Sequence, residues 1–368
     1  MPEFVSLREV LRSPAAAQAD PPSQGPVDAA LDPRIDELLA GLRIVLAKLD
    51  ALLPPSLDGP IPVPAQRRAI AQPLWTGVRC IDALLTIGRG ARLGIFGAPG
   101  AGKSTLLETI VCGARADAVL VGLIGERGRE AQRWLATRDV RTTVIYATSD
   151  RSAAERVRAA EQLLGHAAAL AQRGLHVLVV LDSLARFAYA LRELAVAAGE
   201  SVGRGGYPPS VFSRLAQLLE RAGNFGSGSI TLLATVLEDG DARDPVSECA
   251  RSLLDGHIQL SSRLAQEGRF PAIDVVASTS RTMDDVAAPE HRRAAAVVRS
   301  ALARLDACAE ARALGIEPVE AAVLAAVAAE PAIDRLLLQG RDPAEPAATL
   351  ECLRQTADTL GVPYGYQQ

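Results

Sequence analysis

The chain has 368 residues, of which 49% are hydrophobic and 22% are charged, and its formal net charge is -4 at pH 7. This length suffices for about two domains with sizeable cores. The acidic balance argues against a nucleic-acid partner, and the five cysteines, scattered without C-x-x-C spacing, argue against a disulfide framework or a zinc site.

The first 64 residues are expected to form a leader, a helix and a linker. Residues 13–31 are rich in Pro, Ala, Ser and Gln, so we expect a flexible leader over residues 1–31. Residues 32–64 begin with apolar residues at helical spacing and end in a Pro-rich linker; the helix, over residues 34–53, could pack on its own domain or dock on a partner. No apolar signal segment or membrane-spanning run is found, so we expect a cytoplasmic protein.

A glycine-rich loop is the strongest motif of the chain. It fits the P-loop pattern G-x-x-x-x-G-K-[ST] and comprises Gly97, Ala98, Pro99, Gly100, Ala101, Gly102, Lys103 and Ser104. An apolar strand is predicted before it, over residues 92–96, and a helix after it, over residues 105–111. We expect the loop and Thr105 to bind ATP, Lys103 to reach the β- and γ-phosphates, and Ser104 to ligate Mg²⁺.

Apolar runs alternate with helical stretches over the following 140 residues or so. Strands are predicted over residues 119–124, 143–146, 177–181 and 230–237, and a helix over residues 153–171. This order predicts an α/β domain, residues 65–286, whose parallel sheet is covered on both faces. Helices predicted over residues 294–313, 318–329 and 347–360 indicate an all-α domain, residues 287–368.

Three charged residues directly follow predicted strands. Asp182 ends an apolar strand, as does the Walker B carboxylate that holds Mg²⁺. Glu126 follows the preceding strand and could polarise the water that attacks the γ-phosphate, although a solvated charge cluster at a helix start explains it equally well. Arg281 follows the apolar run 273–277, and from the residues alone it reads as a surface arginine or as an arginine finger.

Several blocks between Pro73 and Met283 resemble the ATPase family of flagellar and type III secretion export, which is related to the catalytic β subunit of rotary ATP synthases. The most specific are the runs Gly-Glu-Arg-Gly-Arg-Glu at 125–130 and Asp-Gly-His-Ile at 255–258. Besides the P-loop, the blocks that carry the resemblance are residues 73–82, 122–130, 181–188, 206–212, 244–246, 251–258 and 270–275.

The resemblance implies a RecA-like core that hydrolyses Mg-ATP between the subunits of a ring, expected to be a hexamer, and so energises protein export. It implies that Glu126 is the catalytic glutamate, that Arg281 is a finger given to the neighbouring site, and that Phe270 packs on adenine. The implied partners are stator and stalk proteins, chaperone–substrate complexes and the export gate, with peripheral attachment to the cytoplasmic face of the inner membrane. Loops at 206–212 and 238–241 would move toward a central pore.

The chain also departs from the family pattern. No set of short strands for the usual N-terminal β-barrel is found before residue 65, the family's Gly-Glu-Pro-Pro is replaced at 199–202, Leu191 stands where glutamine is usual, and the C-terminal domain departs around 309–318. Two other functions therefore stay open. One is a nucleotide-binding assembly component with little turnover, and the other is a ring-shaped nucleic-acid translocase, which the acidic charge disfavours.

Overall fold

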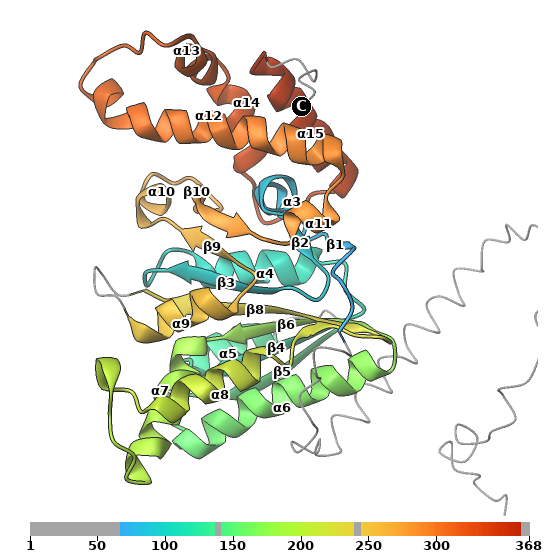
Figure 1. Cartoon of the computed structure of the whole chain (residues 1–368), viewed down its shortest axis with the longest axis vertical. Helices are drawn as coiled ribbons and strands as arrows, with labels where there is room; N and C mark the ends of the chain where they lie inside the picture. The colour runs from blue at the N-terminus through green and yellow to red at the C-terminus, as the bar shows by residue number, and fades with distance from the viewer. Residues whose placement is uncertain (1–66, 137–140, 239–243, 362–368) are drawn as a thin grey trace, which may run out of the picture. The chain divides into compact units, whose positions relative to one another are not determined.

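The computed structural model describes residues 67–136, 141–238 and 244–361 (Figure 1). The predicted leader, the helix at 34–53 and the linker lie outside these residues, as does the predicted loop 238–241 except for Glu238. In the described part, one mixed sheet with helices on both faces is followed by a group of helices, which confirms the predicted α/β core with α-helices after it.

The sheet has the strand order β10-β9-β3-β8-β6-β4-β5, with β7 beside β8. The pairs from β9 to β5 are parallel, whereas β10 is antiparallel to β9 and β7 to β8. All five predicted strands are confirmed. The strands are β3 (Arg92–Gly97), β4 (Ala118–Ile124), β5 (Thr142–Ala147), β6 (His176–Asp182), β7 (Gly223–Asn224), β8 (Ser229–Leu237), β9 (Gly256–Leu260) and β10 (Ile273–Ser280).

Helices cover both faces of the sheet, which is why the central strands are apolar throughout. Alternate residues of β4 contribute to separate cores: Val119 and Val121 pack with α4 and α5, and Leu120 and Ile124 pack with α6 to α8. The helices of these two layers are α4 (Lys103–Gly113), α5 (Gly128–Leu135), α6 (Ala153–Gln172), α7 (Leu184–Ala197), α8 (Pro209–Leu219) and α9 (Pro245–Leu253).

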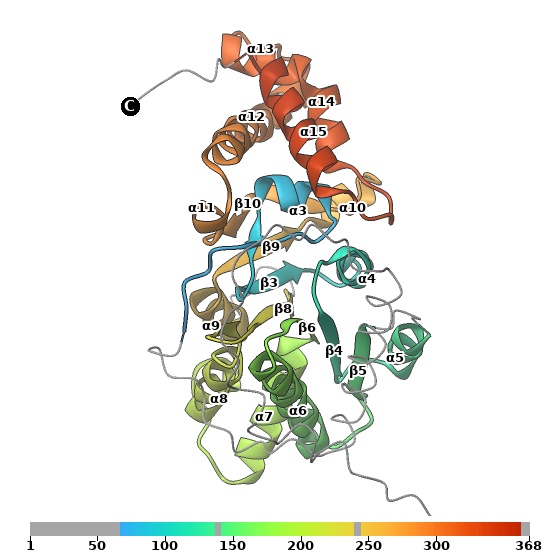
Figure 2. The same cartoon turned by 90° about the vertical axis from the view of Figure 1, so that its right-hand side faces the viewer.

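The remaining helices gather beside α3 and β10 at one end of the sheet, as Figure 2 shows. A two-stranded ribbon of β1 and β2 flanks α3. The elements are β1 (Pro73–Leu74), α3 (Arg79–Leu84), β2 (Ile87–Gly88), α10 (Ser262–Gln266), α11 (Met283–Val286), α12 (Pro289–Ala313), α13 (Ala321–Ala328), α14 (Glu330–Leu337) and α15 (Pro346–Thr359). None of the helices in the described ranges is long and apolar enough to cross a membrane.

Local sequence signals explain most helix ends. Ser152 and Glu155 form a capping box at the start of α6, and the Ser183 side chain caps α7. The helix predicted over 318–329 corresponds to α13, which begins at Ala321 rather than at Pro318, and the next helix, α14 from Glu330, was not predicted. Pro331 lies in the first turn of α14, where its missing N–H group leaves no hydrogen bond unmade.

Candidate functional site

The predicted P-loop joins β3 to α4 at the carboxyl edge of the sheet. Gly100 and Gly102 have φ angles of 80° and 93°, in the left-handed region that glycine adopts without strain. The Lys103 ammonium donates hydrogen bonds to the carbonyl oxygens of Gly97 and Ala98, at 2.7 Å and 2.8 Å. No side chain caps the first turn of α4, so its positive end is available to an anion such as phosphate.

Both predicted carboxylates lie at the same edge. Asp182 ends β6 and is buried, and its Oδ1 accepts a 2.5 Å hydrogen bond from the Thr235 hydroxyl of β8. Burial raises the pKa of Asp182. Glu126 follows the end of β4, and burial, helped by the charges of Asp182 and Glu130, raises its pKa to about 7. The Nε of Arg186 lies 3.9 Å from Oε1 of Glu126 and partly opposes this rise.

The P-loop lysine lies in the electrostatic field of these carboxylates. Burial lowers the pKa of Lys103, and the charges of Asp182, Glu126 and Glu238 act in the opposite direction. The structure therefore brings together the predicted phosphate-binding, metal-binding and water-activating groups. Such a cluster of buried titratable groups with shifted pKa values is typical of active sites.

Phe270 lies in the wall of a pocket of about 310 Å³ beside the P-loop. The pocket is mostly apolar, and its walls come from the P-loop, the loop before β10 and the segment after α14. Its lining includes Val78, Leu106, Leu260, Phe270, Pro271, Gln339 and Arg341. An apolar pocket next to a phosphate-binding loop has the character of a site for a nucleotide base. Phe270 is 48% exposed, so a face of the ring remains free for contact.

Gln339 joins the pocket to the C-terminal helices. The sequence analysis did not predict these contacts. Its side-chain amide donates to the Gly77 carbonyl and accepts from the Arg79 N–H, both at 2.8 Å. Its own backbone N–H donates to the Phe270 carbonyl at 3.0 Å. These contacts link residues about 260 and 70 positions apart, so no local pattern could have indicated them.

Asp82, inside the fold, holds the turn that leads to Val78 in another wall of this pocket. It is fully buried, and its carboxylate accepts hydrogen bonds from the Thr76 N–H at 2.8 Å, the Thr76 hydroxyl at 2.7 Å and the Gly77 N–H at 2.9 Å. Burial raises its pKa to about 6 despite these donors. The turn that these bonds hold leads directly into Val78 of the base pocket.

An Asp82→Ala variant is expected to lower the free energy of unfolding by about 3 kcal/mol, because three buried donors lose their acceptor. It should also raise the KM for ATP, since the turn before Val78 loosens. Urea unfolding followed by circular dichroism measures the first effect, and steady-state phosphate release the second. Asp358→Ala, on the exposed face of α15, is the control and should stay within about 0.5 kcal/mol of the parent; equal stability of both variants would contradict the role of Asp82.

Arg281 lies away from the P-loop of its own chain. Phe96 of β3, next to the P-loop, pairs with Gln259, whereas Ser280 at the end of β10 pairs with Gly256. Arg281, directly after β10, therefore lies beside the amino end of β9, roughly 10 Å along the strand from Gln259 at about 3.3 Å per residue. The residue is exposed, and within the described ranges its guanidinium forms no ion pair with a carboxylate.

A polar cluster around Arg251 that no motif predicted lies next to the P-loop strand. Arg251 donates to Glu238 at 2.6 Å and to Gln259 at 2.9 Å, and Gln259 donates to Glu238 at 2.8 Å. The guanidinium carbon lies 4.1 Å from the centroid of the Phe96 ring. Arg251 belongs to a block that resembles the export ATPases, but sequence reasoning assigned it no role.

The donor set fits Mg²⁺ held together with a nucleotide. No group of three or more His, Cys, Asp or Glu side chains that could hold a metal ion is found in the part of the chain that the structure describes. Mg²⁺ is usually bound by one or two protein oxygens together with substrate phosphates. The Ser104 hydroxyl, in the first turn of α4, and the Asp182 carboxylate, at the carboxyl end of β6, are such oxygen donors.

Comparisons with known proteins extend over most of the described residues. The nucleotide-binding domain of the ATP synthase alpha/beta family matches residues 77–280. The type 3 secretion system ATPase of Sinorhizobium fredii (strain NBRC 101917 / NGR234) is 50% identical over 258 residues, 68% of this chain and 57% of the relative. The flagellum-specific ATP synthase of Pseudomonas aeruginosa is 42% identical over 302 residues, 79% of this chain and 67% of the relative.

Solved structures agree with these relatives. The assembled ATPase EscN from the type III secretion system of enteropathogenic E. coli has a TM-score of 0.79 and 41% identity to this chain, covering 82% of it and 75% of EscN. This likeness confirms the predicted RecA-like core. The chain spans little more than half the length of the type 3 secretion relatives that it matches. By its sequence and its fold, the chain belongs to the type III secretion and flagellar ATPase family, within the ATP synthase alpha/beta family.

Proposed function

We propose that this chain is an ATP hydrolase that energises protein export through a type III secretion apparatus. The observation that carries the proposal is the convergence of Lys103, Glu126 and Asp182 at the carboxyl edge of the sheet, beside an apolar pocket lined by Phe270. Relatives with the same fold are named ATPases of type 3 secretion systems. We assign the nucleotide-binding domain to residues 65–286 and the helical domain to residues 287–368.

The proposed reaction depends on positioning and on electrostatic stabilisation. Residues 97–105 bind the phosphates of ATP, Lys103 neutralises charge on the β- and γ-phosphates, and the adenine packs on Phe270. Ser104 and Asp182 would hold Mg²⁺, which neutralises further phosphate charge when bound. Glu126, with its pKa raised to about 7, accepts a proton from the attacking water near neutral pH.

A complete site in this proposal requires two subunits. Arg281 follows the end of β10 that is remote from its own P-loop, and it is exposed without an ion pair in the described ranges, which supports a role at the site of a neighbour. We propose a ring, a hexamer, in which Arg281 stabilises transition-state charge on the adjacent ATP. EscN itself has been solved as an assembled ATPase and in complex with its central stalk EscO.

The other partners follow from the same family membership. We propose a stalk and a stator protein, chaperone–substrate complexes and the membrane export gate, with the chain in the cytoplasm at the inner face of the membrane. The net charge of -4 supports no nucleic-acid partner.

ATP hydrolysis per subunit is expected to rise steeply with protein concentration, because the finger comes from a neighbour. Phosphate release would be measured over a concentration series, with the mass of the particle determined in each sample by light scattering. A rate that rises together with a mass approaching a hexamer is the expected result. A substantial rate from a monomer would contradict the proposed shared site.

One outcome of that experiment would favour a different function. A chain that stays monomeric, binds ATP and hydrolyses almost none would be a nucleotide-binding assembly component, which the remote position of Arg281 makes a specific alternative. A rate stimulated severalfold by single-stranded nucleic acid would instead indicate a translocase. We expect no such stimulation.

A further inference from the structure

Three hydrogen bonds hold Arg281 and its two neighbours in the chain. The Arg281 N–H donates to the Asp255 carbonyl at 3.0 Å. On one side, the Ser280 hydroxyl donates to the Thr86 carbonyl at 2.7 Å, and on the other the Gly88 N–H donates to the Thr282 hydroxyl at 3.0 Å. An exposed side chain thus projects from a backbone with little freedom, which suits a group that must meet a target outside its own subunit.

Asp255, which holds the Arg281 backbone, is itself clamped to the first residue of β3. Its N–H donates to the Arg92 carbonyl at 2.8 Å. Its carboxylate accepts from the Arg92 N–H at 2.9 Å and from the guanidinium Nε and Nη2, both at 3.2 Å. A two-pronged arginine–carboxylate pair restricts both side chains more than a single contact does. The position of the Asp255 carbonyl is therefore determined by Arg92.

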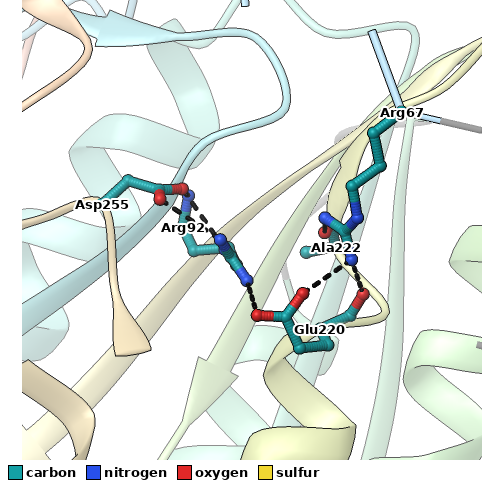
Figure 3. A network of polar contacts seen from close by, with 5 residues as sticks. All are labelled: Arg67, Arg92, Glu220, Ala222 and Asp255. Carbon is teal, nitrogen blue, oxygen red and sulfur yellow. Dashed lines mark hydrogen bonds and ion pairs between the residues drawn. The ribbon is translucent and has the colours of Figure 1, made fainter. Parts of the chain in front are cut away.

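Glu220, directly after α8, extends these contacts from Arg92 to Arg67 (Figure 3). Its carboxylate lies between two arginines and accepts from Arg92 at 2.5 Å and from Arg67 at 2.8 Å. Arg67 also donates to the Ala222 carbonyl at 2.9 Å and to the Glu220 carbonyl. The Arg92 side chain is only 15% exposed, so water screens these interactions less than it screens surface ion pairs.

We propose that Asp255, Arg92 and Glu220 are positioning residues that fix Arg281 for action on the neighbouring site. This inference rests on the proposed function. The chain of contacts runs from Glu220 through Arg92 and Asp255 to the Arg281 N–H. Neither the two carboxylates nor the Arg92 guanidinium contacts the P-loop of its own chain in the described ranges. Their loss therefore lowers turnover in a neighbour while the nucleotide site of the altered subunit stays intact.

The test replaces Asp255 by asparagine in the full chain. The amide NH₂ of D255N then meets the N–H donors of Arg92, so the clamp opens at nearly constant volume. We expect kcat to fall by about tenfold or more, because a misplacement of about 1 Å can lower a rate roughly a hundredfold. The Kd for a fluorescent ATP analogue should stay within about twofold, since the P-loop is unchanged.

Mixing experiments separate a positioning role from a merely structural one. In 1:1 mixtures of D255N with E126Q, the E126Q subunits supply an intact Arg281 to the intact nucleotide sites of D255N subunits. Activity above the sum of the separate proteins is the expected result, and R281A mixed with E126Q should behave alike. The matched control is E193Q, which removes the charge of Glu193 from its ion pair with Arg156. The Arg156 side chain is also 15% exposed, and E193Q should retain full activity.

Each outcome decides one claim. If R281A alone keeps the parent kcat, the proposed finger fails. If R281A loses activity and is rescued, but D255N keeps its kcat or is not rescued, the positioning role is wrong. Should D255N fail to fold by circular dichroism, E220Q takes its place, since it opens only the outer contact. A lowered kcat restored by E126Q supports the proposal, and an unchanged kcat overturns it.

Discussion

A Glu126→Gln variant is expected to bind ATP with parental affinity and to lose about 10²- to 10⁴-fold in kcat. Glutamine retains the size of the side chain but cannot accept the proton of the attacking water. The P-loop contacts of Lys103 with the carbonyls of Gly97 and Ala98 do not involve Glu126, so binding should survive. Steady-state phosphate release gives kcat, and titration with a fluorescent ATP analogue gives the Kd.

The raised pKa of Glu126 adds a test by pH. The carboxylate acts as a base only when it is deprotonated, and burial, Asp182 and Glu130 raise its pKa to about 7. We therefore expect kcat/KM to fall as the pH drops through about 7 and to level off above it. The control is Glu130→Gln, which removes a neighbouring negative charge and should shift the profile to lower pH with turnover retained. Near-parental turnover by E126Q would contradict the assigned role.

A Lys103→Ala variant is expected to weaken ATP binding roughly 10- to 100-fold and to lower kcat by a further factor of about 10² to 10³. The ammonium is held within the P-loop by two carbonyl oxygens at 2.7 Å and 2.8 Å, where phosphate oxygens would replace them as partners. Alanine carries no positive charge to offset the negative charge of the phosphates. The same binding titration and phosphate-release assay measure both effects.

The composition of the chain provides a control for this variant. The only lysines of the sequence are Lys48 and Lys103, so Lys48→Ala should leave ATP binding and turnover unchanged. A lysine-acylating reagent at mildly alkaline pH gives a second measurement, since these two lysine side chains are its targets. Mass spectrometry should find that ATP protects Lys103 and leaves the labelling of Lys48 unchanged. Equal labelling of Lys103 with and without ATP would argue against its contact with phosphate.

The parts of the site that the sequence predicted are those with contiguous signals. The P-loop needs eight adjacent residues with a strand before and a helix after, and the structure has β3 and α4 there. Glu126 and Asp182 each end an apolar strand, and parallel strands bring their carboxyl ends to one edge. Strand prediction therefore placed both carboxylates at one edge of the sheet, and the structure showed that their strands are neighbours. The roles of Phe270 and Arg281 came from the family resemblance and stay proposals.

The contacts that no local pattern indicates join residues far apart in the chain. Gln339 reaches Gly77 across 262 positions, and Glu220 reaches Arg92 across 128. Pairing of this kind depends on how helices and strands pack. The sequence does not distinguish an arginine or carboxylate that forms such a pair from one that remains in solvent. Helix α14 was not predicted, because its eight residues give only a short periodic signal.

By itself, the sequence determined the α/β class, the order of the strands along the chain and the phosphate-binding loop, because backbone conformation and apolar periodicity are local properties. Only the tertiary structure decided which side chains share a site. It raised the pKa of Glu126 through burial and neighbouring charge, closed the apolar pocket beside the P-loop with the segment between α14 and α15, and placed Arg281 after the end of β10 that is remote from its own P-loop. Burial, charge and distance are properties of the packed chain, and they exist only once its distant parts have met.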